Sequence, residues 1–483
     1  MKFLKIGLIV LLIFIALLVA GGWIFFSTFD ANRYVPQLTQ AVRVATGRDL
    51  AIGNARLSFS FTDGVLLQLE KVALSDDPRF SDAYFAKAAR VVLSLDLGAF
   101  LREKSLVISN ASVLDPEVML IRAKDGRVNA AAIGGGPSSG PSTVSVEARG
   151  REVAAKAALP LFVIKKFQVR GARIRYMDRS FEPAINISLE KGSFDVKDFS
   201  LVAPFTFDLS AALLAGEPNL LIAGRAAVDA VTSSVNVRDV TISLALDNVS
   251  AALLADALPM LKPVAVKQMR GKAAVELRKA RFGARGIEEL DAGLTVDMRD
   301  TVLTGINLLA VGLNSISLFP DLLNIVMPDL PEGTQADIRR GITAVDHLGI
   351  VGSVMGGSVT VQKMELDARD LSVSAQGGFG FQLQSMAPGD LDLKAAFFIA
   401  PKLTDVLVGK VPEFSGLKQE DGRVYIPFTL SGPMLKPKVL PDLDYLAKRL
   451  LIGQGGREIQ RVLKDPAVGK AVGELFNSIF KGK

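Results

Sequence analysis

The chain has 483 residues, a hydrophobic fraction of 49% and a formal net charge of +6, with no basic block interleaved with aromatic residues, so nucleic acid is a poor partner for it. It has no cysteine, which excludes disulfides, zinc–thiolate sites and thiol nucleophiles. Its single histidine, His347, severely restricts acid–base and metal chemistry.

The first element is an uncharged run of 21 residues, Ile6 to Phe26. As a helix it would be about 31 Å long, enough to cross the hydrocarbon core of a bilayer. Lys2 and Lys5 precede the run and Asp30 follows it, so the positive-inside rule places the short amino end in the cytoplasm. A cleaved signal peptide is the alternative, but its apolar core would be only ~7–15 residues long. We therefore expect a retained single-pass anchor.

A helix is expected next, over residues 32–46, because Val35, Leu38 and Val42 share one side and Gly47 is a typical helix end. A second short helix is expected at residues 251–261. Strands are expected at residues 51–61, 65–74, 89–97, 105–122, 162–178, 184–200, 204–214, 218–229, 264–279, 290–299 and 423–431, with alternation also running from 357 to 400.

These strands repeat one pattern, in which apolar residues alternate with polar ones. In residues 205–210, Phe205, Phe207 and Leu209 share one face, and the residues between them take the other face. Each such strand is expected to be half-buried, with one apolar and one solvated side. The candidates for lining an apolar groove are Val91, Leu93, Leu95, Phe205, Phe207, Leu209, Ile242, Leu244, Phe379, Phe381, Leu383, Ile426 and Phe428.

One strand changes its parity along its length. Phe167 and Val169 are odd-numbered, whereas Ile174 and Tyr176 are even-numbered. A β-bulge near Gly171 would bring both pairs to the same face, and we predict one there.

Two segments have helical spacing instead. Between residues 303 and 348, Ile325, Ile338, Ile342 and Val345 recur at helical intervals, which predicts a helical insertion or lid. His347 falls within this segment, and with no catalytic partner motif in the chain we interpret it as structural.

The other helical segment follows the prolines after residue 432, where two amphipathic helices are expected. The membrane-surface candidates of this segment are Leu475, Phe476, Ile479 and Phe480. A plain helical cap on the last strand explains the same pattern equally well.

Several short motifs occur in a fixed order in the first 130 residues. They are Tyr34, the segment 45–50 (ATGRDL), the segment 74–76 (LSD), the segment 88–95 (AARVVLSL), the segment 115–120 (DPEVML) and the segment 125–129 (DGRVN). Their order and spacing resemble the N-terminal region of the AsmA family of Gram-negative envelope proteins. This resemblance implies an inner-membrane anchor, a long periplasmic β-groove related to bridge-like lipid-transfer proteins, and a role in phospholipid movement or homeostasis.

The expected fold is mostly β. An N-terminal transmembrane helix precedes an elongated, curved antiparallel β-sheet groove with short helical insertions, and a C-terminal amphipathic helical segment follows. The expected divisions are the cytoplasmic tip and anchor (1–29), a family-like β block (30–132), a flexible Gly/Ser/Pro-rich linker (133–146), a repetitive β-groove (147–432) and the helical segment (433–483).

The functional expectation is a periplasmic lipid-binding or lipid-transfer element anchored in the bacterial inner membrane. Its expected partners are membrane phospholipids and an envelope protein at the C-terminal end. No catalytic residue, cofactor or metal site is expected, because no nucleophile, Walker or metal-binding motif occurs. The alternative is a non-enzymatic envelope scaffold or outer-membrane assembly factor whose strands close into β-sandwich cores.

Overall fold

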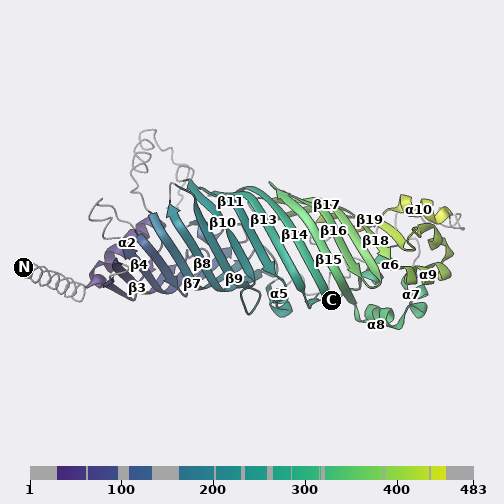
Figure 1. Ribbon diagram of the computed structural model, residues 1–483, viewed down its shortest axis with the longest axis horizontal. Coiled ribbons are helices and arrows are strands. Elements are labelled where there is room, and N and C mark those ends of the chain that lie inside the picture. Colours follow the sequence, from purple (N-terminus) through teal and green to yellow (C-terminus); the bar gives the residue numbers. More distant parts are fainter. Residues whose placement is uncertain are drawn as a thin grey trace, which may run out of the picture. The chain divides into compact units, whose positions relative to one another are not determined.

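The computed structural model describes residues 30–60, 64–95, 108–132, 163–200, 203–229, 234–257, 265–283, 286–314, 316, 321–383, 387–433 and 437–452 (Figure 1). The described chain divides into two compact units. Unit 1 runs up to Ala212 and includes Ala223–Val235, and unit 2 comprises Leu213–Ile222 and the chain from Asn236 onward. Strands predominate in both, as predicted.

The expected anchor and the C-terminal membrane-surface candidates cannot be compared with the structure. The run Ile6–Phe26, the linker at 133–146 and the four candidates Leu475, Phe476, Ile479 and Phe480 all lie outside the described residues. Within the described ranges, none of the helices is long and apolar enough to cross a membrane.

Unit 1 begins with a short helical segment and continues as strands. Its elements are η1 (Ala31–Tyr34), α2 (Val35–Thr46), β1 (Leu50–Ala51), β2 (Asn54–Ser60), β3 (Gly64–Ser75), β4 (Tyr84–Leu95), β5 (Ile108–Leu114), β6 (Glu117–Arg122), η2 (Asn129–Ala132), β7 (Val163–Asp178), β8 (Ile185–Ser200), β9 (Phe205–Leu213) and β10 (Leu220–Asp229). The predicted end of α2 is confirmed, because Gly47 adopts a left-handed conformation with φ of 72° there.

The sheet of unit 1 is mixed, which corrects the expectation of a purely antiparallel sheet. Strands β1 and β2 both pair with β3, and β3, β4 and β5 pair antiparallel in turn. Strands β5 and β6, however, both run parallel to β7. The connection through residues 123–162 makes this geometry feasible, because it exceeds the roughly dozen residues that a parallel crossover requires.

A bend crosses the strands of unit 1 at residues in the left-handed conformation. Lys71, Asp115, Gly171 and Lys191 have φ of 51°, 48°, 70° and 52°, respectively. The β7–β8 register shifts between Val169 and Ala172, which confirms the bulge predicted near Gly171. A Cβ at Gly171 would collide with the Asp115 carboxylate, so glycine is required there by both its φ and its surroundings.

A buried polar cluster joins three of the motifs quoted above. The Arg48 guanidinium lies 3.1 Å from the Asp76 carboxylate, and their side chains are 3% and 0% exposed. Asn129 donates from Nδ2 to the other Asp76 oxygen at 2.8 Å, and its backbone carbonyl accepts from Arg48 Nη2. The Arg48 guanidinium also stacks 4.6 Å over the ring of Phe85. Segments far apart in sequence are thereby fixed to one another beside α2 and β1.

Unit 2 contains longer strands and most of the helices. Its elements are β11 (Ser234–Ala245), α5 (Ala251–Ala257), β12 (Ala265–Lys267), β13 (Arg270–Gly283), β14 (Gly286–Thr304), α6 (Leu308–Asn314), α7 (Leu322–Val326), η4 (Met327–Asp329), α8 (Glu332–Arg340), β15 (Ile342–Met355), β16 (Ser358–Ala368), β17 (Leu371–Gln382), β18 (Ala387–Ile399), α9 (Pro401–Lys410), η5 (Pro412–Leu417), β19 (Val424–Pro433), β20 (Lys438–Pro441) and α10 (Leu443–Ile452). Strands β13 to β20 pair antiparallel in chain order.

The helical insertion is shorter than predicted. Helices occupy residues 308–340, whereas residues 303–304 end β14 and residues 342–348 begin β15. Gly341, with φ of 62°, ends α8 and releases the chain into β15. His347 therefore lies on a strand and not on a helix, paired in register with Arg299 and Asp367. The helical spacing of Ile342 and Val345 was coincidental, because they pair regularly with Thr304 and Thr301 and so lie on opposite faces of the strand.

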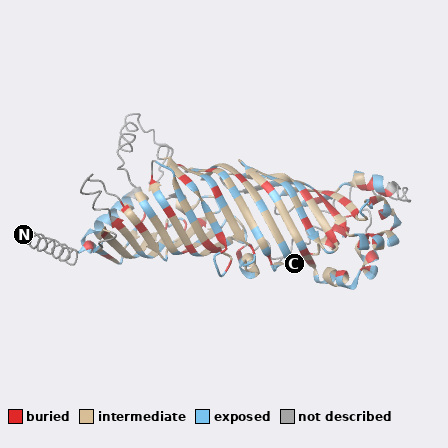
Figure 2. Cartoon of the chain, viewed as in Figure 1, coloured by how far each residue is buried: buried red, intermediate tan, exposed pale blue. Residues whose placement is uncertain are grey.

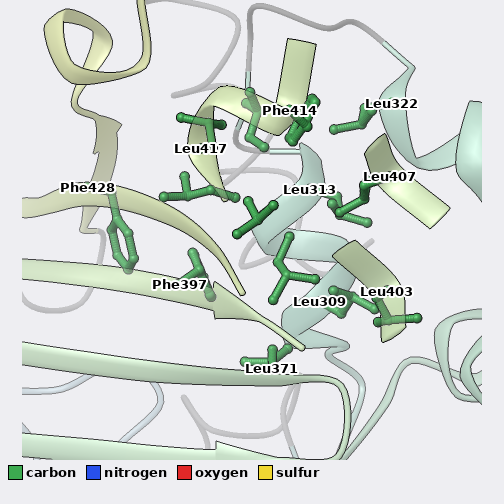
Figure 3. Close-up of a cluster of buried hydrophobic side chains, with 14 of the residues drawn as sticks. Leu309, Leu313, Leu322, Leu371, Phe397, Leu403, Leu407, Phe414, Leu417 and Phe428 are labelled. Carbon is green, nitrogen blue, oxygen red and sulfur yellow. The ribbon is translucent and has the colours of Figure 1, made fainter. Parts of the chain in front are cut away.

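The main apolar core lies at one end of unit 2. Helices α6, α7, α9 and α10 and the turn η5 enclose it against β17, β18 and β19 (Figure 3). Its helical members include Leu313, Leu407 and Phe414, which are 1%, 1% and 0% exposed. Figure 2 shows buried residues gathered among these helices, while the strands of unit 2 farther from them carry mainly half-buried and exposed positions.

We predict that Arg48→Ala lowers the free energy of unfolding by about 3–5 kcal/mol, because it leaves the buried Asp76 carboxylate without its countercharge. Arg43→Ala is the matched control. Arg43 pairs with Asp49 at 3.4 Å, but both side chains are about two-thirds exposed at 66% and 70%, so its loss should cost at most about 1 kcal/mol. Urea unfolding followed by circular dichroism measures both variants, and similar losses would contradict the structural role of the buried cluster.

Candidate functional site

The apolar side chains of unit 1 form rows that run across the strands. Residues paired in register project to the same face of a sheet, so a row of paired apolar residues makes a continuous strip. One row is Ala55, Leu69, Val91, Val113, Val169 and Phe194, and the next is Leu57, Leu67, Leu93, Ala111, Phe167 and Val196. With strands about 4.8 Å apart, each row extends roughly 24 Å.

Beyond the bend the strip continues on the same face. The row there is Leu74, Ala86, Val118, Ile174 and Leu189. At the bend, a left-handed residue exchanges the faces to which odd-numbered and even-numbered side chains of the strand project. This exchange accounts for the change from odd-numbered to even-numbered apolar residues around Gly171. We call these three rows, together with Phe205, Phe207 and Leu209 of β9, the apolar face of unit 1. Ring contacts connect β9 to the rows. The ring centroids of Phe207 and Phe194 are 6.2 Å apart, and those of Phe194 and Phe167 are also 6.2 Å apart.

The opposite side of unit 1 is polar and carries cross-strand ion pairs. Arg170 donates to Asp195 at 2.7 Å and keeps the pKa of that carboxyl below its ordinary value. Arg173 bridges Glu117 at 3.0 Å and Glu190 at 2.6 Å, joining three strands. These charged groups remain partly solvated, so their ion pairs contribute little to the stability of the fold. They do show which side of the sheet faces water.

The apolar face of unit 1 is only partly buried. Several of its large apolar side chains are half-buried, namely Val91, Leu93, Phe205, Phe207 and Leu209. The described strands of unit 1 belong to a single hydrogen-bonded sheet.

Unit 2 repeats the arrangement on its own sheet. Its rows are Gly271, Met298, Leu348, Leu366, Val373, Phe397 and Ile426, then Ala273, Val296, Ile350, Met364, Ala375, Ala395 and Phe428, then Leu277, Ala292, Val354, Val359, Phe379 and Leu391. We call these rows the apolar face of unit 2. Adjacent positions outside the rows are charged or polar, such as Lys272 opposite Asp297 and Gln376 opposite Lys394.

Burial rises along the first two of these rows toward the helical end. In the first row, Met298 and Leu348 are half-buried, whereas Leu366 and Phe397 are each 6% exposed and Ile426 is 0% exposed. The buried members belong to the core cluster beneath the helices. The helices α6, α9, η5 and α10 therefore close the apolar face of unit 2 over the parts of β17–β19 that carry Leu371, Ala395 and Ile426. The face remains uncovered by these helices toward β13 and at Phe379, which is not a member of this core.

The residues predicted to line a groove fall into these two settings. Ile426 and Phe428 lie in the closed core, where Phe428 stacks on Phe397 with ring centroids 4.7 Å apart. Phe379 and Phe381 are half-buried on β17, and Leu383 is half-buried in the turn that follows it. On β11, Ile242 and Leu244 are also half-buried. Leu95 continues β4 and pairs in register with Val65.

Polar groups suited to metal binding or catalysis are scarce in the described ranges, where no cluster of His, Asp and Glu side chains could hold a metal ion. His347 lies 3.9 Å from both Asp297 and Asp367 on the polar side of unit 2. A cavity of about 520 Å³ is lined by Lys363, Glu365 and Lys394 among other residues of β16–β19. Its lining combines charges of both signs with Met364, Ala375, Ala395 and Phe428 of the second row, so it is not a purely apolar extension of the face.

Sequence reasoning missed most of the rows' members on β5, β8 and β14. Val113, Phe194 and Met298 occupy the same rows as predicted residues, and each alternates with a polar neighbour in the sequence. That alternation was the available signal. What it could not supply was the register, which decides that Val91 stands beside Val113 and not beside Ala111.

Comparison with known proteins gives one family. The model of the AsmA family matches residues 1–284, which confirms the resemblance noted in the first 130 residues and extends it through β13. No curated protein matches the chain.

Substitution of phenylalanine by alanine should distinguish the closed core from the uncovered face. We expect Phe414→Ala to cost about 3–5 kcal/mol of unfolding free energy, because it removes a fully buried ring. Phe379→Ala, on the uncovered part of the same unit, should cost less than about 2 kcal/mol, because its ring is already partly hydrated. Urea unfolding tests the pair. Equal losses would mean that the apolar face of unit 2 is packed like a core.

Proposed function

Because the chain belongs to the AsmA family, we propose that it is a periplasmic protein, anchored in the inner membrane by Ile6–Phe26, that binds phospholipid acyl chains on its apolar faces. We propose further that it contributes in this way to lipid transport or to outer-membrane lipid homeostasis. The observation that carries the proposal is the set of in-register apolar rows whose large side chains, such as Val91, Leu93 and Phe379, are only half-buried.

The free energy of burying apolar surface favours lipid as the ligand that covers the half-buried apolar rows. Each acyl methylene that leaves water contributes about 0.8 kcal/mol, so a chain lying along a row of six strands gains several kilocalories per mole. The rows have no charged member, so an acyl chain meets no desolvated charge along them. Headgroups remain in solvent beside the polar edges. Such carriage requires no reaction, and we propose a binding function and not an enzymatic one.

The closed end of unit 2 limits how far a lipid could extend along its apolar face. A lipid that lies on the apolar face of unit 2 could extend only as far as the helical core over β17–β19. Protein partners in the envelope are proposed for this C-terminal end, where the amphipathic segment 433–483 begins.

The proposal predicts that the purified full chain retains phospholipid, and that Phe207→Asp or Phe381→Asp each lowers the retained amount about tenfold. A carboxylate that displaces roughly two methylenes at ~0.8 kcal/mol each accounts for a change of that size. Mass spectrometry of lipid extracted from protein purified in the same detergent measures the effect.

Thr206→Asp is the matched control, because Thr206 is exposed on the opposite side of the same strand. It should retain as much lipid as the unchanged chain. Protein that is folded by circular dichroism and yet carries no lipid in any variant would favour the alternative function, an envelope scaffold.

A further inference from the structure

The helix α2 and Tyr34 just before it present a mainly apolar stripe that is exposed to solvent. Tyr34, Leu38, Ala41 and Val44 follow one another at helical intervals of four, three and three residues, and the uncharged Gln37 is exposed among them. Tyr34, Leu38 and Val44 are 49%, 37% and 78% exposed, and Ala41 is exposed as well. Large apolar residues exposed together in this way indicate an interaction surface.

The inner side of α2 is already occupied. Val35, Thr39 and Val42 are half-buried on the side of the helix that borders the stripe at Leu38. Just before the helix, the Asn32 side chain accepts a hydrogen bond from the backbone of Ala55 at 2.8 Å and ties the start of the helical segment to β2. The helix is thus held by one side, and the stripe cannot turn inward without breaking these contacts.

The position of α2 in the chain identifies what meets the stripe. The uncharged run ends at Phe26, and only three residues separate it from Asp30. Four residue steps span at most about 14 Å. If the run crosses a bilayer, as proposed above, the start of the helical segment is therefore held close to the membrane surface.

The composition of α2 fits an interfacial position. No Asp or Glu occurs between Ala31 and Gly47, so no carboxylate lies on the helix to be desolvated. Its exposed arginines, Arg33 and Arg43, form ion pairs with Asp30 and Asp49 at either end, which leaves the middle of the stripe free of charge. Apolar residues on one side of a helix with basic residues at its margins are typical of helices that lie in the headgroup region.

We propose that α2 lies on the membrane with the stripe Tyr34, Leu38, Ala41 and Val44 in the headgroup region, and so sets the orientation of unit 1 to the bilayer. This inference rests on the proposed membrane anchor. In this arrangement β1 and β2, which follow α2 directly, are the first strands of unit 1 beside the membrane.

The absence of cysteine allows a direct test on the full chain. Leu38→Cys and Gln40→Cys are labelled separately with an environment-sensitive fluorophore. The protein is then reconstituted into phosphatidylethanolamine–phosphatidylglycerol vesicles that contain a lipid with a nitroxide quencher near its headgroup. Leu38 and Gln40 are both exposed but lie on opposite sides of α2, so each is a control for the other.

We expect quenching at residue 38 to exceed quenching at residue 40 by about twofold or more. Leu17→Cys, near the middle of the uncharged run, is measured in parallel with a quencher deep in the acyl region. Quenching at residue 17 without preferential quenching at residue 38 would overturn the inference while leaving the anchor intact. Absence of quenching at residue 17 would remove the anchor, and with it the inference.

Discussion

The constraint on which this structure depends is the hydrogen-bonded register between neighbouring strands. Side chains alternate along each strand, so a shift of one residue would turn a whole apolar set to the polar side. The pairing of Leu69 with Val91, and of Val91 with Val113, avoids such a shift and produces strips that cross the strands. Where a strand bends, as at Gly171, a left-handed residue restores the alignment. An apolar face results without a second sheet to shape it.

This arrangement separates the part of the protein that supplies stability from the part that remains available. In unit 2, fully buried residues such as Leu313 and Phe414 provide a closed core in which helices cover the sheet. Residues of the same rows farther from the helices, such as Met298 and Ile350, are only half-buried. In unit 1, the buried Arg48–Asp76 pair fixes the turns around the first strands, whereas large side chains of the apolar face such as Val91 and Phe207 are only half-buried. A protein that holds a mobile apolar ligand needs both features, because the protein surface that binds the ligand cannot also be packed as the protein's core.

Much of the fold followed from the sequence because alternation is a local signal. Phe205 and Phe207 could be assigned to one face, and the parity change around Gly171 predicted its bulge, from residues a few positions apart. Contacts that join distant segments were out of reach. The parallel pairing of β6 with β7 depends on a crossover that no local pattern reveals. The burial of Ile426 depends on helices of the C-terminal part that fold over it. His347 was placed on a helix because Ile342 and Val345 happen to lie three residues apart, although on the strand they face opposite sides.

The central claim is that the apolar faces hold acyl chains, and photo-crosslinking in living cells tests it most directly. A benzophenone amino acid would replace Phe207 in unit 1 or Leu393 in unit 2, where Leu393 lies between the row members Leu391 and Ala395 on the same side of β18. Thr206 and Lys394, their neighbours on the opposite side of each strand, would be replaced as controls. Irradiation followed by mass spectrometry of the purified chain identifies what each position touches. We expect phospholipid adducts at residues 207 and 393 and none at residues 206 and 394. Adducts to protein alone at residues 207 and 393, or equal lipid adducts at all four positions, would contradict the claim.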